Sequence, residues 1–329
     1  MVLDEHSTRD AARPGHDDIA AAGGPVSGWA TFGVVWIAIS VQAIGRWLLS
    51  DDFQPAPVLG PDVFPAWRLV SLRVLELVSM VVLLGFVWFC VIKPWRRSGK
   101  LSLDGKFVIG GVFGAVADAC LNLYIYLFAW NAHSVNYGVW AGFMPFHKAG
   151  ATTRFGEGLL WGVPMYIYFC TGAAIVGCQV VHFLRRRFPG ITNVRTLSAV
   201  FIVLVVLGMV LENTIIRITQ AYGYAQTTEW MTLFPGAAYQ FPVYESLCTA
   251  ALGLAFTVVR LSALDSPDGV SVIERGYLRW RPGLQEPVRL LAVIGFSVAA
   301  MLLLYHLPFN WLGVGGTSFA DLPSYLLPG

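Results

Sequence analysis

The sequence predicts an all-α polytopic membrane protein, with about seven transmembrane helices in one bundle. Hydrophobic residues make up 56% of the 329 residues and charged residues only 13%, about half the share that is usual in a soluble domain. The hydrophobic residues form runs long enough for the roughly 20 residues of helix that cross a bilayer. They do not alternate with polar residues, as the strands of a membrane β-barrel would.

These runs divide the chain into an N-terminal tail and one membrane domain. Residues 1–27 are rich in acidic residues, Gly, Ala and Pro, which predicts a disordered acidic tail in the cytoplasm. The tail lacks the basic and apolar regions of a signal peptide. Residues 28–329 are predicted to form the seven-helix domain with long structured outer loops. We expect the spans at residues 28–49, 67–92, 107–130, 157–184, 197–219, 240–259 and 288–307.

Basic residues predict the orientation of this domain. Most of the 22 Lys and Arg residues lie in the tail and in the segments 93–106, 185–196 and 260–289, which alternate along the chain. Because positively charged loops stay in the cytoplasm, we expect a cytoplasmic N-terminus and an outside C-terminus. The predicted location is the cell (plasma) membrane, with multiple passes.

Motifs for metals, cofactors and phosphates are missing from the sequence. None of the five cysteines forms a CxxC pair, and the histidines show no cluster typical of a di-iron site. HExxH, GxSxG, Walker-type loops and aspartate-rich diphosphate motifs are also absent. We therefore expect no metal, no cofactor and no nucleic-acid partner.

Carboxylates in the outer halves of the predicted helices are the candidate catalytic residues. Ionisable residues inside a membrane are costly and are functional candidates for that reason. Asp118 and Glu212 lie deepest and form the predicted acid–base pair, with Asn122 one turn from Asp118. Glu157 and Glu245 come next, although each lies near a predicted helix N-terminus, where the helix dipole alone would explain a carboxylate.

Two pairs of polar residues have a structural explanation beside the functional one. Arg73 and Glu76 are three residues apart and share a helix face, so they can form a simple ion pair. Asn213 and Arg217 are four apart, and Arg217 can tie its helix to a carboxylate on a neighbouring helix. In the functional interpretation, Arg73 and Arg217 are orienting cations for the substrate.

The loops on the predicted outer side are unusually long and aromatic. Residues 128–161, residues 220–246 and the C-terminal tail are dense in hydrogen-bonding groups, which favours re-entrant or lid segments around a pocket. Their aromatic residues can stabilise a cation through their ring faces, with core packing as the alternative. The candidate substrate-binding residues are Arg73, Glu76, Asn122, Trp130, Asn131, His133, Tyr166, Asn213, Arg217, Tyr239 and Tyr244.

Several of these runs resemble the spirocyclase AveC family of actinobacterial membrane proteins. The resemblance covers roughly Trp29 to Gly329 and rests on FAWNAHSVNYG, PFHKAGATTRFGEGLLWG, PMYIYFC, YQFPVYES and HLPFNWLG. It implies a polytopic membrane fold and the formation of a spiroacetal from a dihydroxy-ketone, with dehydration as a related activity. It supplies no set of catalytic residues.

The favoured hypothesis is a membrane-embedded cyclase or dehydratase that acts by carboxylate acid–base catalysis on a lipophilic, polyketide-like or isoprenoid-like oxygenated substrate. A carboxylic acid desolvated in the bilayer has a raised pKa and can serve as the acid. One alternative is a transmembrane terpene cyclase, which would use the same acid and aromatic rings. Others are a non-catalytic lipid or small-molecule carrier or receptor, and a structural membrane protein. The expected partners are the lipophilic substrate and membrane lipid.

Overall fold

The computed structural model describes residues 24–148, 154–318 and 321–328 and is mostly helical. Within this part of the chain, six helices are long and apolar enough to cross a membrane. They are α2 (Val26–Leu48), Ala66–Ser98, α6 (Gly162–Arg187), α7 (Asn193–Thr219), α8 (Val243–Leu264) and Pro282–Val314. Six of the seven predicted spans are thus confirmed as helices of sufficient length. The predicted tail of residues 1–27 lies almost entirely outside the described residues, and α2 already begins at Val26.

Two of the six long helices contain a wider π-helical turn. Ala66–Ser98 consists of α3 (Ala66–Phe86), the π-helical turn Val87–Ile92 and α4 (Lys93–Ser98). Pro282–Val314 consists of α9 (Pro282–Met301), the π-helical turn Leu302–His306 and α10 (Leu307–Val314). π-Helical turns are frequent at functional sites, and the second one places Tyr305 and His306 in the interior.

The third predicted span, residues 107–130, is wrong as a single helix. Helix α5 (Leu103–Val116) has 14 residues, about 21 Å of helix at 1.5 Å per residue. It continues as a 3-10 helix, Ala117–Asn122, and the chain then enters strand β1 (Phe128–Trp130). The chain turns here because Asn122 Oδ1 accepts hydrogen bonds from the backbone N–H groups of Leu127 and Phe128.

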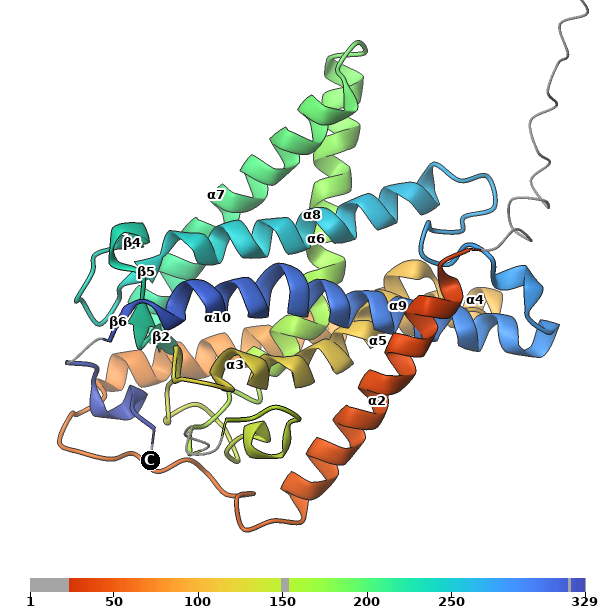
Figure 1. Cartoon of the computed structure of the whole chain (residues 1–329). Coiled ribbons are helices and arrows are strands. Elements are labelled where there is room, and N and C mark those ends of the chain that lie inside the picture. The colour runs from red at the N-terminus through yellow and green to blue at the C-terminus, as the bar shows by residue number, and fades with distance from the viewer. Residues whose placement is uncertain (1–23, 149–153, 319–320, 329) are drawn as a thin grey trace, which may run out of the picture.

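Three small antiparallel sheets connect the long loops at one end of the bundle. Strand β1 pairs with β2 (Tyr222–Tyr224), β3 (Gln226–Thr227) with β6 (Thr317–Ser318), and β4 (Thr232–Leu233) with β5 (Phe241–Pro242). We call residues 123–148, 154–161, 220–242, 315–318 and 321–328 the sheet end; Figure 1 shows its strands and the C-terminus close together. The structure therefore brings together the three segments in which the sequence predicts a shaped pocket.

Glycines let the helices of the bundle approach closely. A Cβ atom on Gly33 of α2 would lie 2.2 Å from the carbonyl oxygen of Leu291, and one on Gly295 of α9 would lie 2.0 Å from that of Trp29. Added Cβ atoms on the GxxxG glycines of α5 would likewise collide with the α9 side chains Ser297 and Met301. The GxxxG motif of Gly110 and Gly114 therefore lets α5 and α9 pack closely.

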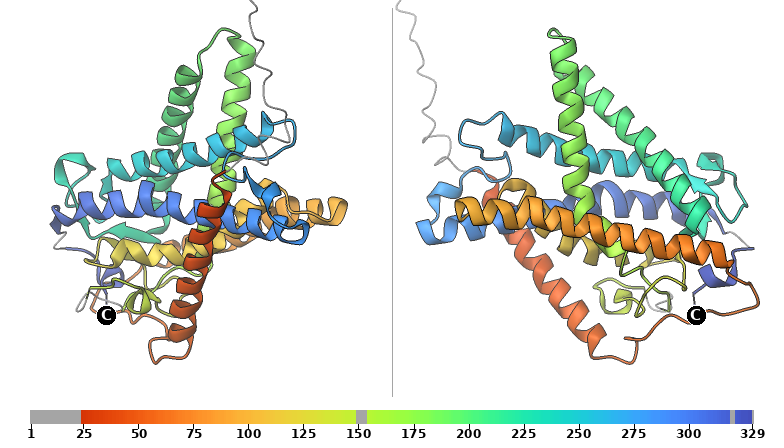
Figure 2. Two further views of the ribbon diagram at one scale, coloured as in Figure 1. Left: turned by 45° about the vertical axis from the view of Figure 1, so that its right-hand side comes forward. Right: turned by 180° about the vertical axis from the view of Figure 1, so that it is seen from behind.

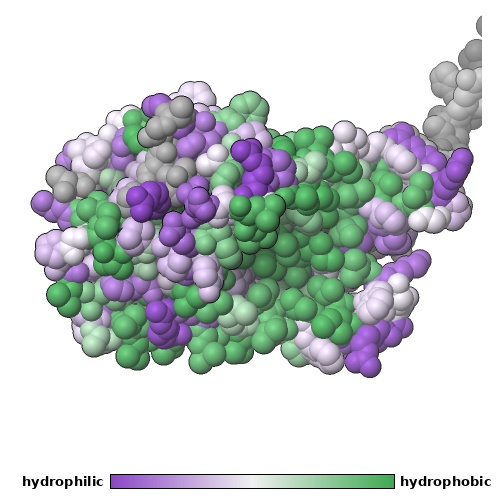
Figure 3. Space-filling model, turned by 90° about the horizontal axis from the view of Figure 1, so that it is seen from below, coloured by the Kyte–Doolittle hydropathy of each residue, from purple (hydrophilic) through white to green (hydrophobic). Residues whose placement is uncertain are grey.

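The outer surface of the bundle has the hydropathy pattern of a membrane protein. In Figure 2, α6 crosses the long helices steeply and forms a protruding hairpin with α7. Figure 3 shows apolar residues in a wide central band, with more hydrophilic residues toward both ends. The exposed side of α3 carries Val74, Leu77, Val78 and Val81. Large exposed apolar surfaces of this kind mark contact with lipid or protein.

Candidate functional site

A cavity of about 60 Å³ lies where α3, α6 and α7 meet the sheet end. Helix α3 contributes Leu75 and Ser79, and α7 contributes Glu212 and Ile215. In the described part of the chain, Glu212 is the only acidic or basic side chain that lines it. The other lining residues are Met165 and a set of aromatic residues, namely Phe128, Trp130, Trp161, Tyr166, Tyr168, Tyr222 and Tyr305.

Ring stacking fixes one wall of this cavity. The ring of Tyr222 stacks on Phe128, with centroids 4.8 Å apart and planes at 14°, and on Trp161 at 5.3 Å and 21°. Trp130 packs against Phe128 at 4.9 Å and against Trp161 at 5.0 Å. The β1–β2 ladder pairs Trp130 with Tyr222 directly. Backbone pairing and ring packing together therefore hold this wall in one arrangement.

Glu212 and Glu245 form one pair of carboxyl groups near the cavity. Glu245 lies in the first turn of α8, as predicted, and its side chain is buried. It lies within electrostatic range of Glu212 and beside the Tyr305 hydroxyl. Its Oε2 atom also accepts a long hydrogen bond, 3.5 Å, from Ser246 Oγ. Of this pair, Glu212 lines the cavity and Glu245 does not.

Asp118 and Glu157 form a second pair. Asp118 is buried in the 3-10 helix after α5, beside the Tyr166 hydroxyl and within electrostatic range of Glu157. No described residue makes a well-aligned hydrogen bond to either carboxyl oxygen of Asp118. Tyr305 lies within electrostatic range of Asp118 as well as of the first pair. The four predicted catalytic carboxylates are thus brought together around Tyr166 and Tyr305.

The position of Glu157 differs from the prediction. It precedes the first residue of α6, Gly162, so the helix dipole does not account for it. Its side chain is fully buried, and its oxygens have no hydrogen-bond partner among the described residues. Burial, and then the nearby charge of Asp118, raise the pKa of Glu157 well above its usual value.

The predicted binding residues Arg73 and Glu76 form an ion pair that holds the sheet end. Arg73 Nη1 lies 2.6 Å from Glu76 Oε2, and Arg73 Nη2 donates a hydrogen bond to the carbonyl oxygen of His133 at 2.9 Å. Glu76 Oε1 accepts a hydrogen bond from the N–H of Val135 at 2.8 Å. The imidazole of His133 stacks on Phe64, with centroids 4.9 Å apart. None of these residues lines the cavity described above.

The three predicted asparagines bond to backbone groups. Asn122 Nδ2 donates to the carbonyl oxygen of Phe128 at 2.8 Å, in addition to the two bonds that its Oδ1 accepts. Asn131 Nδ2 donates to the carbonyl oxygen of Gln220 at 2.8 Å, and Asn213 Nδ2 to that of Met209 in its own helix at 2.8 Å. Asn122 and Asn131 thus replace backbone partners that loops lack, whereas Asn213 bonds within its own helix α7.

Arg217, Tyr239 and Tyr244 lie away from the cavity. The Arg217 guanidinium group is 4.5 Å from the ring centroids of both Phe234 and Tyr239. In the part of the chain that the structure describes, Arg217 makes no ion pair with a carboxylate, contrary to the structural interpretation of its sequence position. Tyr244 is buried and packs on Phe309, with centroids 5.4 Å apart. Of the predicted aromatic residues, Trp130 and Tyr166 line the cavity.

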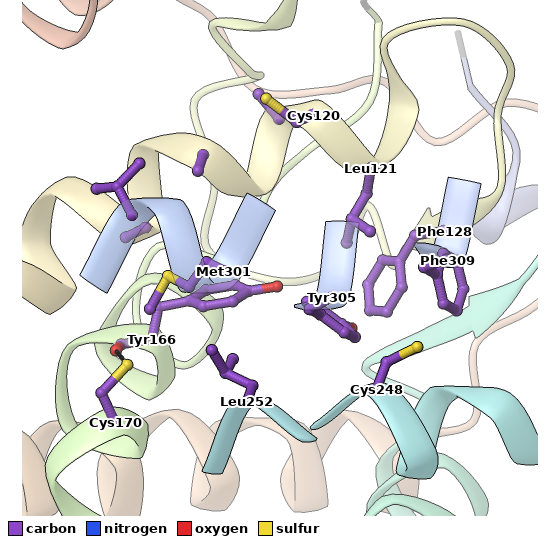
Figure 4. Packing of buried hydrophobic residues seen from close by; sticks show 14 of the residues in the cluster. Cys120, Leu121, Phe128, Tyr166, Cys170, Cys248, Leu252, Met301, Tyr305 and Phe309 are labelled. Atoms are coloured by element: carbon purple, nitrogen blue, oxygen red, sulfur yellow. Dashed lines mark hydrogen bonds between the residues drawn. The ribbon is translucent and has the colours of Figure 1, made fainter. Parts of the chain in front are cut away.

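Sequence reasoning missed Trp161, Tyr222, Tyr305 and His306 as site residues. The His306 ring is fully buried, 5.1 Å from the ring of Tyr305 and 6.0 Å from that of Tyr166. Figure 4 shows Tyr166 directed toward Tyr305, with Phe128 beyond it. A signal for His306 was present, because it is an ionisable residue at the end of a predicted span. Trp161 and Tyr222 lie in the long segments predicted to surround a pocket, but nothing in the sequence distinguished them from the other aromatic residues there. Tyr305 lies in a predicted span, where aromatic residues are usually core residues.

Together these features define a helical protein with six helices able to span a membrane and a small aromatic cavity backed by carboxyl groups. A family model described as Spirocyclase AveC-like matches residues 95–321. The chain therefore belongs to the AveC-like spirocyclase family, which confirms the resemblance seen in the sequence. The match includes all four carboxylates and most of the cavity lining. Searches of curated proteins and of solved structures found no match.

Proposed function

We propose that this protein is a membrane-embedded cyclase that forms spiroacetals from lipophilic hydroxy-ketones with loss of water. The observation that carries the proposal is the Glu212 carboxyl group in an aromatic cavity, with the buried Glu245 within electrostatic range of it. Two more buried carboxyl groups, those of Asp118 and Glu157, lie within electrostatic range of Tyr166, which also lines the cavity. Membership of a spirocyclase family supports the same reaction class. The apolar surface of the bundle suits a substrate that arrives from the membrane.

The reaction needs one proton donor and one proton acceptor. A carboxylic acid protonates the hydroxyl of a cyclic hemiketal, the C–O bond breaks, and water leaves to give an oxocarbenium ion. The second hydroxyl of the substrate attacks this carbon, a new C–O bond forms, and a carboxylate takes the released proton. One hemiketal thus gives one spiroacetal and one water, and the carboxyl groups together neither gain nor lose a proton.

We assign Glu212 and Asp118 different roles on the basis of their positions. Glu212 lines the cavity and is placed to exchange a proton with the substrate. Asp118 lies behind Tyr166, which also lines the cavity, so we assign Asp118 the partner role through the Tyr166 hydroxyl. Glu157 and Glu245 lie within electrostatic range of Asp118 and Glu212 respectively, and we assign them a supporting role beside these two residues.

The cavity walls suit the cationic intermediate. Most of its lining side chains are aromatic, and aromatic ring faces attract a cation. Lys and Arg side chains, which would repel the oxocarbenium ion, are absent from the described lining. A water-poor cavity also limits the return of water to the cation.

Conversion of a dihydroxynonanone, with hydroxyls at both chain ends and a central ketone, tests this proposal. The protein is placed in lipid nanodiscs at neutral pH, and the spiroacetal and its enantiomeric excess are measured by chiral gas chromatography. We expect an excess of one enantiomer, because spontaneous cyclisation gives a racemate. Glu212→Gln and Asp118→Asn should each lower turnover by about 100-fold or more while substrate binding stays within a few-fold.

Arg217→Gln is the control, since Arg217 does not line the cavity and its guanidinium group lies over the rings of Phe234 and Tyr239 in the sheet end. It should keep wild-type turnover. A wild-type protein that binds the ketone but yields only racemate would indicate a carrier or receptor. Normal turnover in both carboxylate variants would refute the acid–base assignment.

A further inference from the structure

The hydroxyl group of Tyr222 is an unused polar group at the cavity. The residue is 2% exposed, and its hydroxyl oxygen has no hydrogen-bond partner among the described residues. Several other buried polar groups share this property, including those of Asp118, Tyr224 and His306. Within that set, Tyr222 is the residue that lines the cavity.

Ring stacking restricts the orientation of the Tyr222 side chain. Its ring packs nearly parallel to Phe128 and to Trp161, so its faces are taken up by ring contacts. Its backbone is fixed by the pairing with Trp130 in the β1–β2 ladder. These ring contacts are made by the faces of the ring and not by its edge, which carries the hydroxyl. Little reorganisation is available to bring this hydroxyl to another partner.

An unpaired buried hydroxyl is costly. Leaving a donor without a partner costs about 1–3 kcal/mol, and phenylalanine would fill the same place in the ring stack without this cost. Tyrosine hydroxyls that are buried usually find a partner. Glu212 lies in the same cavity, so a molecule bound there meets both groups.

We propose that the Tyr222 hydroxyl is a substrate-binding group that donates a hydrogen bond to an ether or carbonyl oxygen of the ligand. This inference rests on the proposed function and specifies its ligand as one with an oxygen at the reacting centre. Tyr222 holds that oxygen, while Glu212 serves the proton transfer. Tyr222 thereby makes the cavity selective for oxygen heterocycles over hydrocarbons of the same shape.

Tyr168 offers a matched control in the same cavity. It also lines the cavity, but its hydroxyl lies 3.1 Å from Ser79 Oγ in a hydrogen bond. Removal of either hydroxyl takes away one oxygen atom from the lining. The Tyr168 hydroxyl thus already has a partner, whereas the Tyr222 hydroxyl has none among the described residues.

The test compares tetrahydropyran with cyclohexane, which have the same ring size and differ by one ether oxygen. Binding to the full chain in nanodiscs is measured by saturation-transfer NMR, at equal concentrations of each probe in the membrane. The wild type and Tyr168→Phe should prefer tetrahydropyran by about fivefold, the value of one net hydrogen bond. Tyr222→Phe should lose this preference, bind cyclohexane unchanged, and melt at the same or a higher temperature.

Three results would overturn the proposal. They are an ether preference that persists in Tyr222→Phe, an equal loss in Tyr168→Phe, and failure of the wild type to bind either probe. The binding test is separate from turnover of the dihydroxynonanone. An ether preference that depends on Tyr222 in a protein without turnover would therefore refute the cyclase and keep the binding role.

Discussion

Lys106 Nζ lies 2.8 Å from Glu274 Oε1, and both side chains are buried. Lys106 belongs to α5 and Glu274 to the loop between α8 and α9, so the pair joins segments 168 residues apart in the chain. Arg289 Nε of α9 lies 2.9 Å from the same oxygen of Glu274. This buried cluster holds the end of the bundle opposite the sheet end.

Glu274→Gln should destabilise the protein in a pH-dependent way. Burial alone would raise the pKa of Glu274, but the charges of Lys106 and Arg289 outweigh it and lower the pKa below the usual value. The ionised carboxylate therefore contributes stability above the unfolded-state pKa, and this is lost as pH falls through the lower folded-state pKa.

At neutral pH we expect the free energy of unfolding to fall by about 3 kcal/mol, since the substitution takes a carboxylate partner from the buried Lys106 and the partly buried Arg289. The measurement is thermal unfolding of both proteins from pH 7 down to pH 3. The gap in melting temperature should narrow at the acidic end. A gap that is constant with pH would show that the charge of Glu274 is not the stabilising element.

Glu157→Gln should have the opposite pH dependence. Burial and the charge of Asp118 raise the pKa of Glu157, so ionisation is easier in the unfolded chain than in the folded one. Because of this difference, the free energy of unfolding of the wild type falls as pH rises above the ordinary carboxyl pKa. The melting temperature of the Gln variant should therefore be higher than that of the wild type at pH 8 and equal to it at pH 4. A variant that melts lower at pH 8 would contradict the stated pKa direction.

Gly295→Ala should disrupt the crossing of α2 and α9. The new Cβ atom would lie 2.0 Å from the carbonyl oxygen of Trp29, so the two helices must separate. We expect the free energy of unfolding to fall by about 3 kcal/mol or more, the upper end of the range typical of overpacking. Gly283→Ala is the control in the same helix, because nothing lies within 4 Å of its added Cβ. Denaturation in mild detergent measures both, and equal melting temperatures would exclude a close crossing.

Glu76→Ala should loosen the sheet end more than Arg73→Ala does. The Glu76 side chain is 3% exposed and accepts the Val135 N–H bond, whereas the Arg73 side chain is 47% exposed. We expect Glu76→Ala to lower the free energy of unfolding by about 1–3 kcal/mol, because it leaves a backbone donor unpaired. Arg73→Ala should lower it by less than about 1 kcal/mol. Limited proteolysis near residues 131–138 is the measurement. Equal protection in both variants would show that the hydrogen bond to Val135 contributes little.

The candidate site shows what sequence patterns could and could not predict. The sequence singled out Asp118 and Glu212 because an ionisable residue deep in a predicted span is costly. Such a residue can be recognised in a long apolar run without knowledge of the fold. The same logic gave Arg73, and the spacing of one helical turn from Asp118 gave Asn122. The side chains of both instead complete backbone hydrogen bonding at the sheet end. Those backbone groups lack partners only once the loops have folded, so the sequence carries no sign of them. Tyr222 was missed for the same reason.

By itself, the sequence determined the long apolar helices, since burial in a bilayer depends on the summed hydropathy of about 20 consecutive residues. It also determined the family, through runs of residues around the sheet end. Only the tertiary structure decided that α5 stops short, and that Glu212, Tyr166 and Tyr222 share one cavity. The physical reason is that these features depend on contacts between distant segments, such as the pairing of Trp130 with Tyr222. Local periodicity does not encode such contacts.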